Sequence, residues 1–397
     1  MRVRTRVAII GAGPAGLMLS HLLERSGIES VVLEVRSRDH LEQRVRAGVL
    51  ETPTVDLLRA VGLGARMDAE GMPHEGFSLR FDGEDHRIAL TELTGKRIVV
   101  YGQQEVVKDL IGARLAAGGQ LEFEVSEVEL HEIESGPRVA FTDMAGRRQE
   151  LRADILVGAD GFRGISRDAY PVGAMRGYDR HYPFAWLGIL AQSAPSHTEL
   201  IYAYSDYGFA LHSMRSPEIT RLYLQVAPDE DLARWPDERI WDELRRRLAL
   251  RDGSFTLTEG PILDKGITAM RSFVAEPMRH GQLFLAGDAA HIVPPTGAKG
   301  MNLAIADVAV LARALDAFFA RGDDRALAAY SDRCLRRVWR AEHFSHTMTT
   351  MLHRAPTGDP FDGRLQLSQL RYTAASPAAA TSLAENYVGL PLTGVAP

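Results

Sequence analysis

A glycine-rich turn near the N-terminus constrains the fold more than any other feature of this chain. The apolar run Val7–Ile10 leads into the turn Gly11–Gly16, and an amphipathic segment, Pro14–Arg25, follows before Gly27. A second apolar run, Ser30–Leu33, comes next. Short apolar runs predict buried strands, and the amphipathic segment between them predicts a helix. The chain therefore opens with a predicted strand–helix–strand unit.

The glycines of this turn match a dinucleotide-binding pattern. Gly11, Gly13 and Gly16 have the spacing G-x-G-x-x-G, with Ala15 inside it, and Glu34 ends the next predicted strand. In such a turn the backbone approaches a pyrophosphate, and an acid in the position of Glu34 binds an adenosine ribose hydroxyl. A bare glycine pattern is often an ordinary turn, but its placement between a strand and a helix favours dinucleotide binding. These residues leave FAD and NAD(P) both open.

A second strand end decides between the two cofactors. The apolar run Leu283–Ala286 ends in Gly287 and Asp288, and a Pro- and Gly-rich loop leads to a helical pattern near Gly297–Met301. Asp288 can accept a hydrogen bond from a ribitol hydroxyl, and N–H groups at the start of that helix favour an anion such as a reduced flavin. A nicotinamide enzyme does not require this second strand end, so we interpret the pattern as FAD binding. Asp160 follows a third apolar run of the same kind.

Composition excludes several other classes of protein. With 397 residues the chain is long enough for two or three domains, and its net charge of −6 argues against a nucleic-acid-binding surface. Its single cysteine, Cys334, excludes an intrachain disulfide and a cysteine-cluster metal site. A reducing compartment is consistent with this, and we expect a cytoplasmic protein. No stretch approaches the roughly 20 apolar residues of a membrane span.

We predict an α/β fold in which distant segments form one Rossmann-like FAD-binding domain. An antiparallel sheet is predicted as an insertion, because Glu199–Tyr204, Gly208–Arg215 and Arg221–Val226 are rich in Tyr, Leu and Val and are separated by turn residues. The charged amphipathic segment Asp237–Leu250 is predicted to cover one side of that sheet. The predicted division assigns 1–73, 101–180 and 273–350 to the FAD-binding domain, 74–100 and 181–272 to the substrate-binding sheet, and 351–397 to a helical C-terminal region with a mobile tail.

Alternating residues of the inserted sheet suit a carboxylate ligand. Period-2 alternation places Ser213 with Arg215, and Arg221 with Tyr223, on one face of their strands, with Tyr202 on the preceding strand. A guanidinium binds a carboxylate through two hydrogen bonds and hydroxyls complete the set, so a small aromatic acid is a natural ligand. Taken singly, each residue is more simply a polar side chain on a half-exposed sheet.

Three motifs together resemble the single-component FAD-dependent aromatic hydroxylases: GAGPAG, ADGFRGISR and GDAAHIVPPTGAKGMN. Other stretches resemble members of that family that act on 4-hydroxybenzoate, and they include RAGVLE at 46–51, YGQQEV at 101–106, YPFAWLG at 182–188 and AENYVGLP at 384–391. The resemblance implies that the chain converts 4-hydroxybenzoate to 3,4-dihydroxybenzoate with O₂ and NADPH or NADH, without a metal, as a homodimer. A different hydroxybenzoate, a flavin oxidoreductase that does not hydroxylate, and a ligand sensor stay open as alternatives.

The resemblance also implies catalytic roles. Tyr202 is implied to contact the phenolic oxygen of the substrate, and Tyr202, Tyr387 and His74 are implied to form a proton relay to solvent. A phenol is mostly protonated at neutral pH, so a hydrogen-bond chain that ends in a histidine titrating near ~6.5 is useful for forming the phenolate. Pro295 and Thr296 are implied to present a rigid backbone edge to the reacting ring.

The binding residues follow from the same resemblance. Arg215, Ser213 and Tyr223 are implied to bind the substrate carboxylate. The residues implied to contact FAD or the nicotinamide cosubstrate come from the glycine turn, the strand ends and the loops beside them; they are Gly11, Gly13, Ala15, Gly16, Glu34, Arg44, Arg46, Gln103, Asp160, Arg221, Asp288, Gly297, Lys299, Gly300, Met301 and Asn302.

A basic cluster follows the second predicted strand, at Arg36, Arg38, Arg44 and Arg46. It is either a solvated charge run or a site for the phosphates of a reduced nicotinamide nucleotide. The resemblance implies that Arg46 contacts FAD, and that Arg44 and Arg271 lie nearer the nicotinamide. Positions that the family associates with NADPH preference differ here, which leaves NADPH and NADH both open; these positions are Val35, Arg36, His40 and Arg163.

Overall fold

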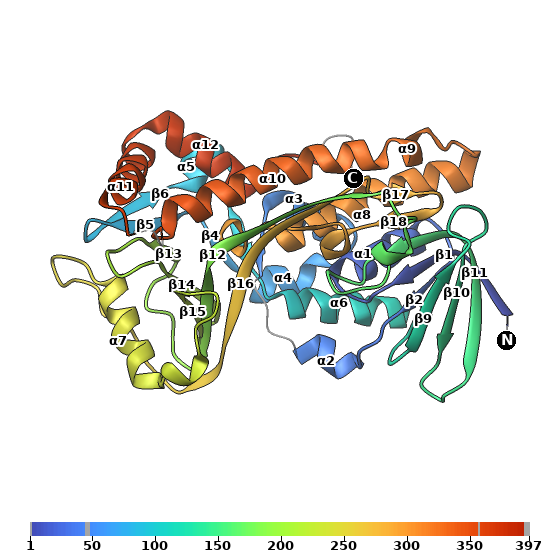
Figure 1. The fold of residues 1–397 in the computed structure, drawn as a ribbon, viewed down its shortest axis with the longest axis horizontal. Coiled ribbons are helices and arrows are strands. Elements are labelled where there is room, and N and C mark those ends of the chain that lie inside the picture. Colours follow the sequence, from blue (N-terminus) through green and yellow to red (C-terminus); the bar gives the residue numbers. More distant parts are fainter. Residues whose placement is uncertain (1, 44–47, 356–357, 393–397) are drawn as a thin grey trace.

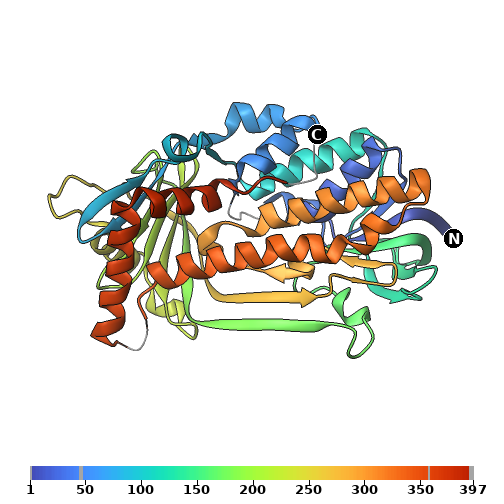
Figure 2. The ribbon, with the colours of Figure 1, turned by 90° about the horizontal axis from the view of Figure 1, so that it is seen from above.

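The computed structural model describes residues 2–43, 48–355 and 358–392. Two large sheets lie toward opposite ends of an elongated molecule, and the long helix α10 (Tyr330–Leu352) extends between them (Figure 1). Viewed from above, α10 runs alongside α8 (Gly300–Arg321) (Figure 2). This arrangement lets one helix contact elements of both halves of the molecule.

The first sheet is mainly parallel and is built from segments that are distant in the sequence. β1 (Arg2–Ile10) pairs in parallel with β2 (Ser30–Leu33) and with β11 (Arg148–Gly158), and β18 (Leu283–Leu285) extends the sheet beside β11. The carboxyl ends of these strands therefore meet at one edge of the sheet, where ligands of α/β proteins bind. The sheet also contains β8 (Gln120–Glu122), β9 (Ser126–His131), β10 (Arg138–Thr142) and β17 (Arg279–His280).

The predicted helix after the glycine turn is present as α1 (Pro14–Arg25). It packs against both α6 (Gln103–Ala116) and α8, so that Leu17 and Leu19 are fully buried. The strand–helix–strand opening predicted from the sequence is confirmed, and the first sheet is assembled from discontinuous segments as predicted.

The second sheet is antiparallel except for one parallel pair, β5 (Phe77–Phe81) with β13 (Leu200–Ala203). The three strands predicted in the inserted sheet are confirmed as β13, β14 and β15, with ends that differ by a few residues. Its strands, in spatial order, are β19 (His291–Ile292), β16 (Ile262–Glu276), β12 (Arg176–Ala191), β15 (Ile219–Val226), β14 (Ala210–Ser216), β13 (Leu200–Ala203), β5 (Phe77–Phe81) and β6 (Glu84–Ile88).

The two faces of this sheet have different partners. On one face, Leu222 and Leu224 form a core with Leu244 of α7 (Asp237–Leu248), the helix predicted to cover the sheet. That helix ends at Leu248 rather than Leu250 because the backbone of Ala249 is extended. The other face contributes aromatic side chains to a core shared with α10 and the C-terminal helices. The candidate site described below lies on this second face.

The remaining elements are a third, small sheet and the shorter helices. A small antiparallel sheet has the order β3–β7–β4, and the C-terminal helices lie at the end of the molecule that holds the second sheet (Figure 1). These elements are β3 (Val49–Leu50), β4 (Met72–His74), β7 (Ile98–Val100), α2 (Arg38–Gln43), α3 (Thr52–Ala60), α4 (Gly64–Glu70), α5 (Leu90–Thr94), α9 (Arg325–Ala328), α11 (Pro360–Ala375) and α12 (Pro377–Val388).

The division into domains stays a prediction. Two of the predicted bounds, at residues 181 and 273, fall inside β12 and β16, which pair along most of their length. Within 74–100, β5 and β6 join the second sheet, whereas β7 joins the small one. The predicted mobile tail lies outside the described residues. None of the described helices combines the length and apolar character needed to cross a membrane.

Candidate active site

The glycine turn is shaped by close backbone approaches. Gly11 has φ +102°, and a Cβ there would lie 2.4 Å from the carbonyl oxygen of Ala159. A Cβ on Gly16 would lie 1.9 Å from the carbonyl oxygen of Gly11. Among the described residues, a Cβ on Gly13 would meet no atom within 4 Å, and no side chain caps the helix that starts beside it. The turn therefore leaves open space and unclaimed N–H groups where a pyrophosphate binds in this type of fold.

Glu34 fixes the turn to the end of β2. Its carboxylate accepts hydrogen bonds from the backbone N–H of Ala12 at 2.7 Å and of Arg36 at 2.8 Å. The side chain is buried beside the glycines, which is the position that the sequence predicts for it. Its contact with a ribose hydroxyl stays a prediction.

The other two strand ends lie at the same edge of the sheet. Asp160 follows β11, and one of its carboxylate oxygens accepts hydrogen bonds from the N–H and hydroxyl of Ser166, each at 2.9 Å. The other oxygen is buried and has no partner among the described residues, and burial raises the pKa of this carboxyl. Asp288 follows β18 and is exposed at this edge. An accessible carboxylate in this place suits a polyol such as ribitol.

A buried ion pair supports the turn that carries Asp288. One carboxylate oxygen of Asp307, on α8, accepts hydrogen bonds from the N–H of Gly287 at 3.0 Å and from Nε2 of His291 at 2.6 Å. Burial lowers the pKa of His291, but the charge and hydrogen bond of Asp307, with contributions from Asp288 and Glu342, raise it overall. The pair therefore holds β18, β19 and α8 together.

The start of α8 offers an anion site. The helix begins at Gly300. In the part of the chain that the structure describes, no side chain caps its first turn, and a Cβ on Gly300 would meet no atom within 4 Å. Gly297, just before it, lies so close to Ser345 of α10 that a Cβ would come within 2.5 Å of the Ser345 hydroxyl. The loop is thus pressed against α10 while the helix N-terminus stays accessible, next to partly exposed Met301.

These features fit FAD. Glu34 and the glycine turn would hold its adenosine and pyrophosphate, Asp288 its ribitol, and the start of α8 its flavin ring. When bound, FAD supplies the redox chemistry with O₂, and the chain supplies binding and orientation.

Two residues expected to contact the cofactor have other partners. The Lys299 ammonium is buried, and it donates to Glu51 at 2.5 Å and to the carbonyl oxygens of Asn386 and Tyr387. Asn302 accepts from the N–H of Glu51 and donates to two carbonyl groups. These side chains are hydrogen-bonded within the protein, and the contact of Lys299 and Asn302 with the cofactor stays a prediction.

The residues predicted to bind a carboxylate share one face of the second sheet, as the alternation predicts. Tyr202 pairs with Leu211, and Leu211 pairs with Tyr223, so these residues share a face of the second sheet with Ser213 and Arg215. Arg215 donates to the hydroxyls of Ser213 at 3.0 Å and Tyr223 at 3.3 Å. Its Nε is buried without a partner among the described residues, and burial lowers the pKa of its guanidinium. A buried cation with an unsatisfied donor suits a carboxylate ligand.

The predicted relay is present in part. The hydroxyls of Tyr202 and Tyr387 are 2.7 Å apart, and burial raises the pKa of both phenols above their ordinary value. His74 is buried, and neither ring nitrogen has a hydrogen-bond partner among the described residues. Burial lowers the pKa of His74 to about 4. This corrects the expectation of a histidine that titrates near neutrality, because the ring is kept away from water.

The other predicted site residues lie on several elements of both halves of the molecule. Pro295 is exposed at the loop, whereas Thr296 is fully buried and its hydroxyl accepts a hydrogen bond from Thr349 of α10 at 2.9 Å. The Arg221 guanidinium lies over the Tyr223 ring, 5.4 Å from its centroid. Ala15 is buried in the first turn of α1, and Gln103 begins α6.

The arginine cluster is described only in part. Arg44 and Arg46 lie outside the described residues. Arg38 forms an exposed ion pair with Glu42 at 2.6 Å. Arg271 lies over the ring of Phe162, 3.9 Å from its centroid, and its Nε is buried without a partner in the part of the chain that the structure describes.

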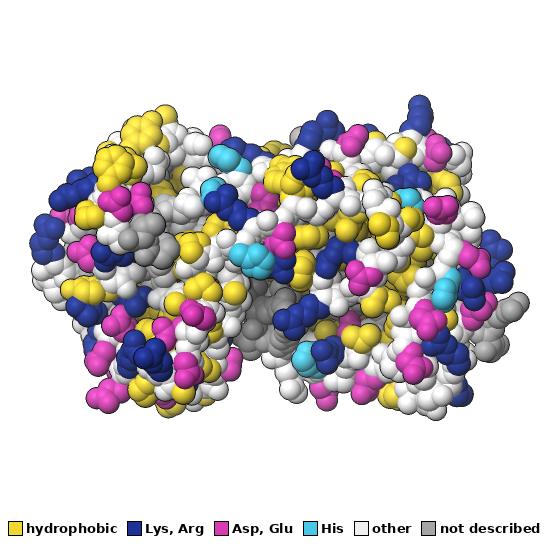
Figure 3. Space-filling model, viewed as in Figure 1, with side chains coloured by type: hydrophobic (Ala, Val, Ile, Leu, Met, Phe, Trp, Pro, Cys, Tyr) yellow, Lys and Arg dark blue, Asp and Glu magenta, His cyan; other side chains and the backbone are white. Residues whose placement is uncertain are grey.

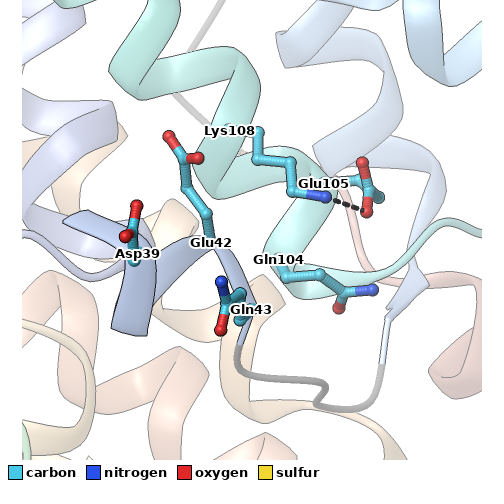
Figure 4. Close-up of a pocket in the computed structure, with 6 residues that line it drawn as sticks. All are labelled: Asp39, Glu42, Gln43, Gln104, Glu105 and Lys108. Atoms are coloured by element: carbon cyan, nitrogen blue, oxygen red, sulfur yellow. Dashed lines mark hydrogen bonds and ion pairs between the residues drawn. The ribbon is translucent and has the colours of Figure 1, made fainter.

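A surface pocket lies between α2 and the start of α6, away from the buried tyrosines. Figure 4 shows Lys108 bonded to Glu105 across part of it. Its lining carries three carboxylates, which repel an aromatic acid, so we do not place the substrate there. The pocket is lined by Asp39, Glu42, Gln43, Gln104, Glu105 and Lys108.

Fold and site together define the class of flavoproteins: one sheet presents the features that fit FAD, and the other presents a guanidinium and hydroxyls that suit a small acid. The model of the FAD binding domain family matches residues 4–345. The chain is 46% identical over 390 residues to p-hydroxybenzoate hydroxylase of Acinetobacter baylyi. The aligned residues cover 98% of this chain and 96% of that protein. The chain belongs to the family of FAD-dependent aromatic hydroxylases.

More distant proteins share the architecture. Aklavinone 12-hydroxylase of Streptomyces purpurascens is 28% identical over 332 residues, which cover 76% of this chain and 60% of that one. The crystal structure of p-nitrophenol 4-monooxygenase from Pseudomonas putida DLL-E4 superposes with a TM-score of 0.83 over 98% of this chain and 99% of that chain, at 18% identity. At that identity the likeness concerns the fold alone.

Several residues that shape the site carry no signal in the sequence. Glu51, Asp307, Thr349 and His353 are ordinary polar residues when read in the chain. Their partners lie far away, as for Glu51 with Lys299, 248 positions apart. A motif search around the glycines and the strand ends finds none of these contacts.

The ion pair of His291 should stabilise the fold most at mildly acidic pH. Folding raises the pKa of His291, so the stabilisation is fully present below the unfolded value of about 6.5 and is lost as the pH rises through the folded value. We expect the loss of unfolding free energy in His291→Gln to be larger at about pH 6 than at about pH 9, as measured by urea denaturation.

His131→Gln, at a partly exposed position of β9 outside this buried pair, is the matched control for the substitution itself. A loss of stability in His291→Gln that is independent of pH would contradict a charged pair.

Proposed function

We propose that this chain hydroxylates 4-hydroxybenzoate at the ring carbon next to the phenol, with FAD, O₂ and NAD(P)H. One observation carries the choice of substrate. The guanidinium of Arg215, whose Nε is buried, and the hydroxyl of Tyr202, which is hydrogen-bonded to Tyr387 of α12, lie on one face of the second sheet and so fit the two ends of a para-hydroxylated acid. The likeness to p-hydroxybenzoate hydroxylase over nearly the whole chain supports the same assignment.

The reaction balances as follows. 4-Hydroxybenzoate, O₂, NAD(P)H and one proton give 3,4-dihydroxybenzoate, water and NAD(P)⁺. The new C–O bond takes one oxygen atom from O₂, the other leaves as water, and the nicotinamide supplies two electrons. No side chain forms a covalent bond to the substrate.

The tyrosines act on the phenolic proton. The Tyr202 hydroxyl would contact the phenolic oxygen and share hydrogen bonds with Tyr387, and the raised pKa of both tyrosines keeps them protonated. Hydrogen bonds to the phenolate favour that form, which makes the neighbouring ring carbon more nucleophilic. The described residues show no hydrogen bond from Tyr387 to His74, so that link stays part of the proposal. His74 would act as a neutral ring, because burial lowers its pKa.

The test of this function is a product assay. Purified holoenzyme should oxidise NAD(P)H rapidly only with 4-hydroxybenzoate, and should form about one 3,4-dihydroxybenzoate per NAD(P)H. Chromatography of the products, run with both NADPH and NADH, measures this ratio. Rapid oxidation that yields only H₂O₂ would identify a flavin oxidoreductase instead. Faster coupled turnover of 3-hydroxybenzoate would move the assignment to another hydroxybenzoate.

Arg215→Ala should weaken binding of 4-hydroxybenzoate by about 2–5 kcal/mol, the range for removing one partner of a buried charge pair. The measurement is a titration of the holoenzyme followed by flavin absorbance. Arg246→Ala, on the exposed side of α7, is the matched control and should bind as the parent does. An unchanged dissociation constant in Arg215→Ala would place the carboxylate elsewhere.

We also propose a homodimer, which the family resemblance implies, and a cytoplasmic location. The outer face of α11 supports the dimer, because Phe361, Leu365 and Tyr372 repeat at helical spacing and are 67%, 56% and 58% exposed. Figure 3 shows hydrophobic side chains gathered over this end of the molecule. An apolar stripe of this kind is typical of a protein–protein contact.

The double variant Phe361→Glu/Leu365→Glu should therefore run at the mass of one chain in light scattering, whereas the parent runs at twice that mass. Val172→Glu, at a fully exposed valine on another surface, should leave the parent mass unchanged. A parent that is a monomer, or a double variant that stays dimeric, would contradict this interface.

A further inference from the structure

An imidazole stands inside an aromatic cluster behind the proposed substrate face. His353 follows the last residue of α10 and is 1% exposed. Its ring stacks on Phe184 at a centroid distance of 4.6 Å and lies 4.3 Å from the ring of Phe209. Burial lowers the pKa of His353 to about 3, so the ring is neutral. The proposed mechanism does not use this group.

Two hydrogen bonds fix the tautomer of this ring. Nδ1 lies 2.8 Å from the carbonyl oxygen of Thr349, and Nε2 lies 2.6 Å from the indole nitrogen of Trp186. A carbonyl oxygen only accepts and an indole N–H only donates. The proton of His353 is therefore on Nδ1, and its Nε2 accepts from Trp186. A ring flipped in place would lose both bonds.

Trp186 connects this histidine to the carboxylate site. Its ring lies 4.6 Å from the ring of Tyr223, whose hydroxyl accepts a hydrogen bond from Arg215. Gly188 pairs with Tyr223 in the sheet, so Trp186, two residues earlier, points to the same face. The orientation of the indole therefore limits where Tyr223 and Arg215 can stand.

Thr349 connects the same turn of α10 to the loop that contains Thr296 and precedes α8, called the flavin loop below. Its hydroxyl donates to Thr296 at 2.9 Å, and its carbonyl oxygen accepts from His353. One turn of helix thus contacts the loop that precedes α8 and the wall that holds the carboxylate site. All three side chains are almost completely buried.

We propose that His353 is a positioning residue for substrate binding. By accepting a hydrogen bond from the indole N–H of Trp186, it fixes the positions of Tyr223 and Arg215 relative to the flavin loop. This inference rests on the proposed function, since it assigns the carboxylate of 4-hydroxybenzoate to Arg215. Without the acceptor, the indole N–H is left buried and unpaired, which favours a different rotamer of Trp186. The indole that packs against Tyr223 then moves, and the hydrogen-bond donors of Tyr223 and Arg215 are less well placed for the substrate carboxylate.

The test compares two ligands that differ only in the group at the acid end, a charged carboxylate or a neutral amide. In His353→Phe, which keeps an aromatic ring but has no acceptor, 4-hydroxybenzoate should bind the holoenzyme about tenfold more weakly, equivalent to about 1.4 kcal/mol. 4-Hydroxybenzamide, which lacks the carboxylate, should change much less. Flavin absorbance titrations measure both dissociation constants, and the emission of Trp186 should shift with the loss of its hydrogen bond.

Conservative and control variants separate positioning from general damage. His353→Gln places an amide oxygen near the position of Nε2 and should restore most of the discrimination between the two ligands. His343→Phe makes the same change at an exposed position of α10, and this variant should bind both ligands as the parent does. If His353→Phe does not fold, Trp186→Phe carries the test, because it removes the donor and should also reduce the discrimination.

The outcomes are distinguishable. Equal weakening of both ligands in His353→Phe, or unchanged discrimination in Trp186→Phe, would overturn the positioning role. A parent that binds 4-hydroxybenzoate and a His353→Phe variant that binds it equally well would overturn the inference alone. A parent that binds neither ligand would contradict the proposed function, and with it this inference.

Discussion

One buried ammonium group connects the parts of the site that the chain must bring together. Lys299 lies at the start of α8, and it bonds to Glu51 and to the backbone carbonyl groups of Asn386 and Tyr387. A buried cation is costly unless it is paired and hydrogen-bonded, and burial does lower the pKa of this lysine. The segments that satisfy it are thereby held against one another. This contact fixes the position of α12. The hydroxyl of Tyr387, on that helix, lies 2.7 Å from the hydroxyl of Tyr202.

The FAD-binding features are local in sequence, and for that reason they could be predicted. Gly11 and Gly16 are required by backbone contacts within a few ångströms, and Glu34 closes the turn from the end of the next strand. The alternation in β14 and β15 likewise predicted that Ser213, Arg215 and Tyr223 would share a face, because a strand has only two faces. Where local geometry decides the structure, the pattern of residues was sufficient.

Burial and long-range pairing could not be predicted in this way. Nothing near His74 in the chain reveals that its ring is closed off from water, and its pKa follows from that burial. The partners of Lys299, His291 and His353 come from other elements. Nothing local in the sequence shows that β12 and β16 pair along most of their length, across two of the predicted domain bounds.

The central claim is that the tyrosine pair favours the phenolate of a bound para-hydroxylated acid. The most direct measurement is the pH dependence of the absorbance of 4-hydroxybenzoate bound to the holoenzyme, in the parent and in Tyr202→Phe. In the parent, we expect the bound phenol to titrate at a lower pH than the free ligand. In Tyr202→Phe, we expect this difference between the bound and the free phenol to disappear. Titration of the bound phenol at the pH of the free ligand, or an equal shift in both proteins, would contradict it.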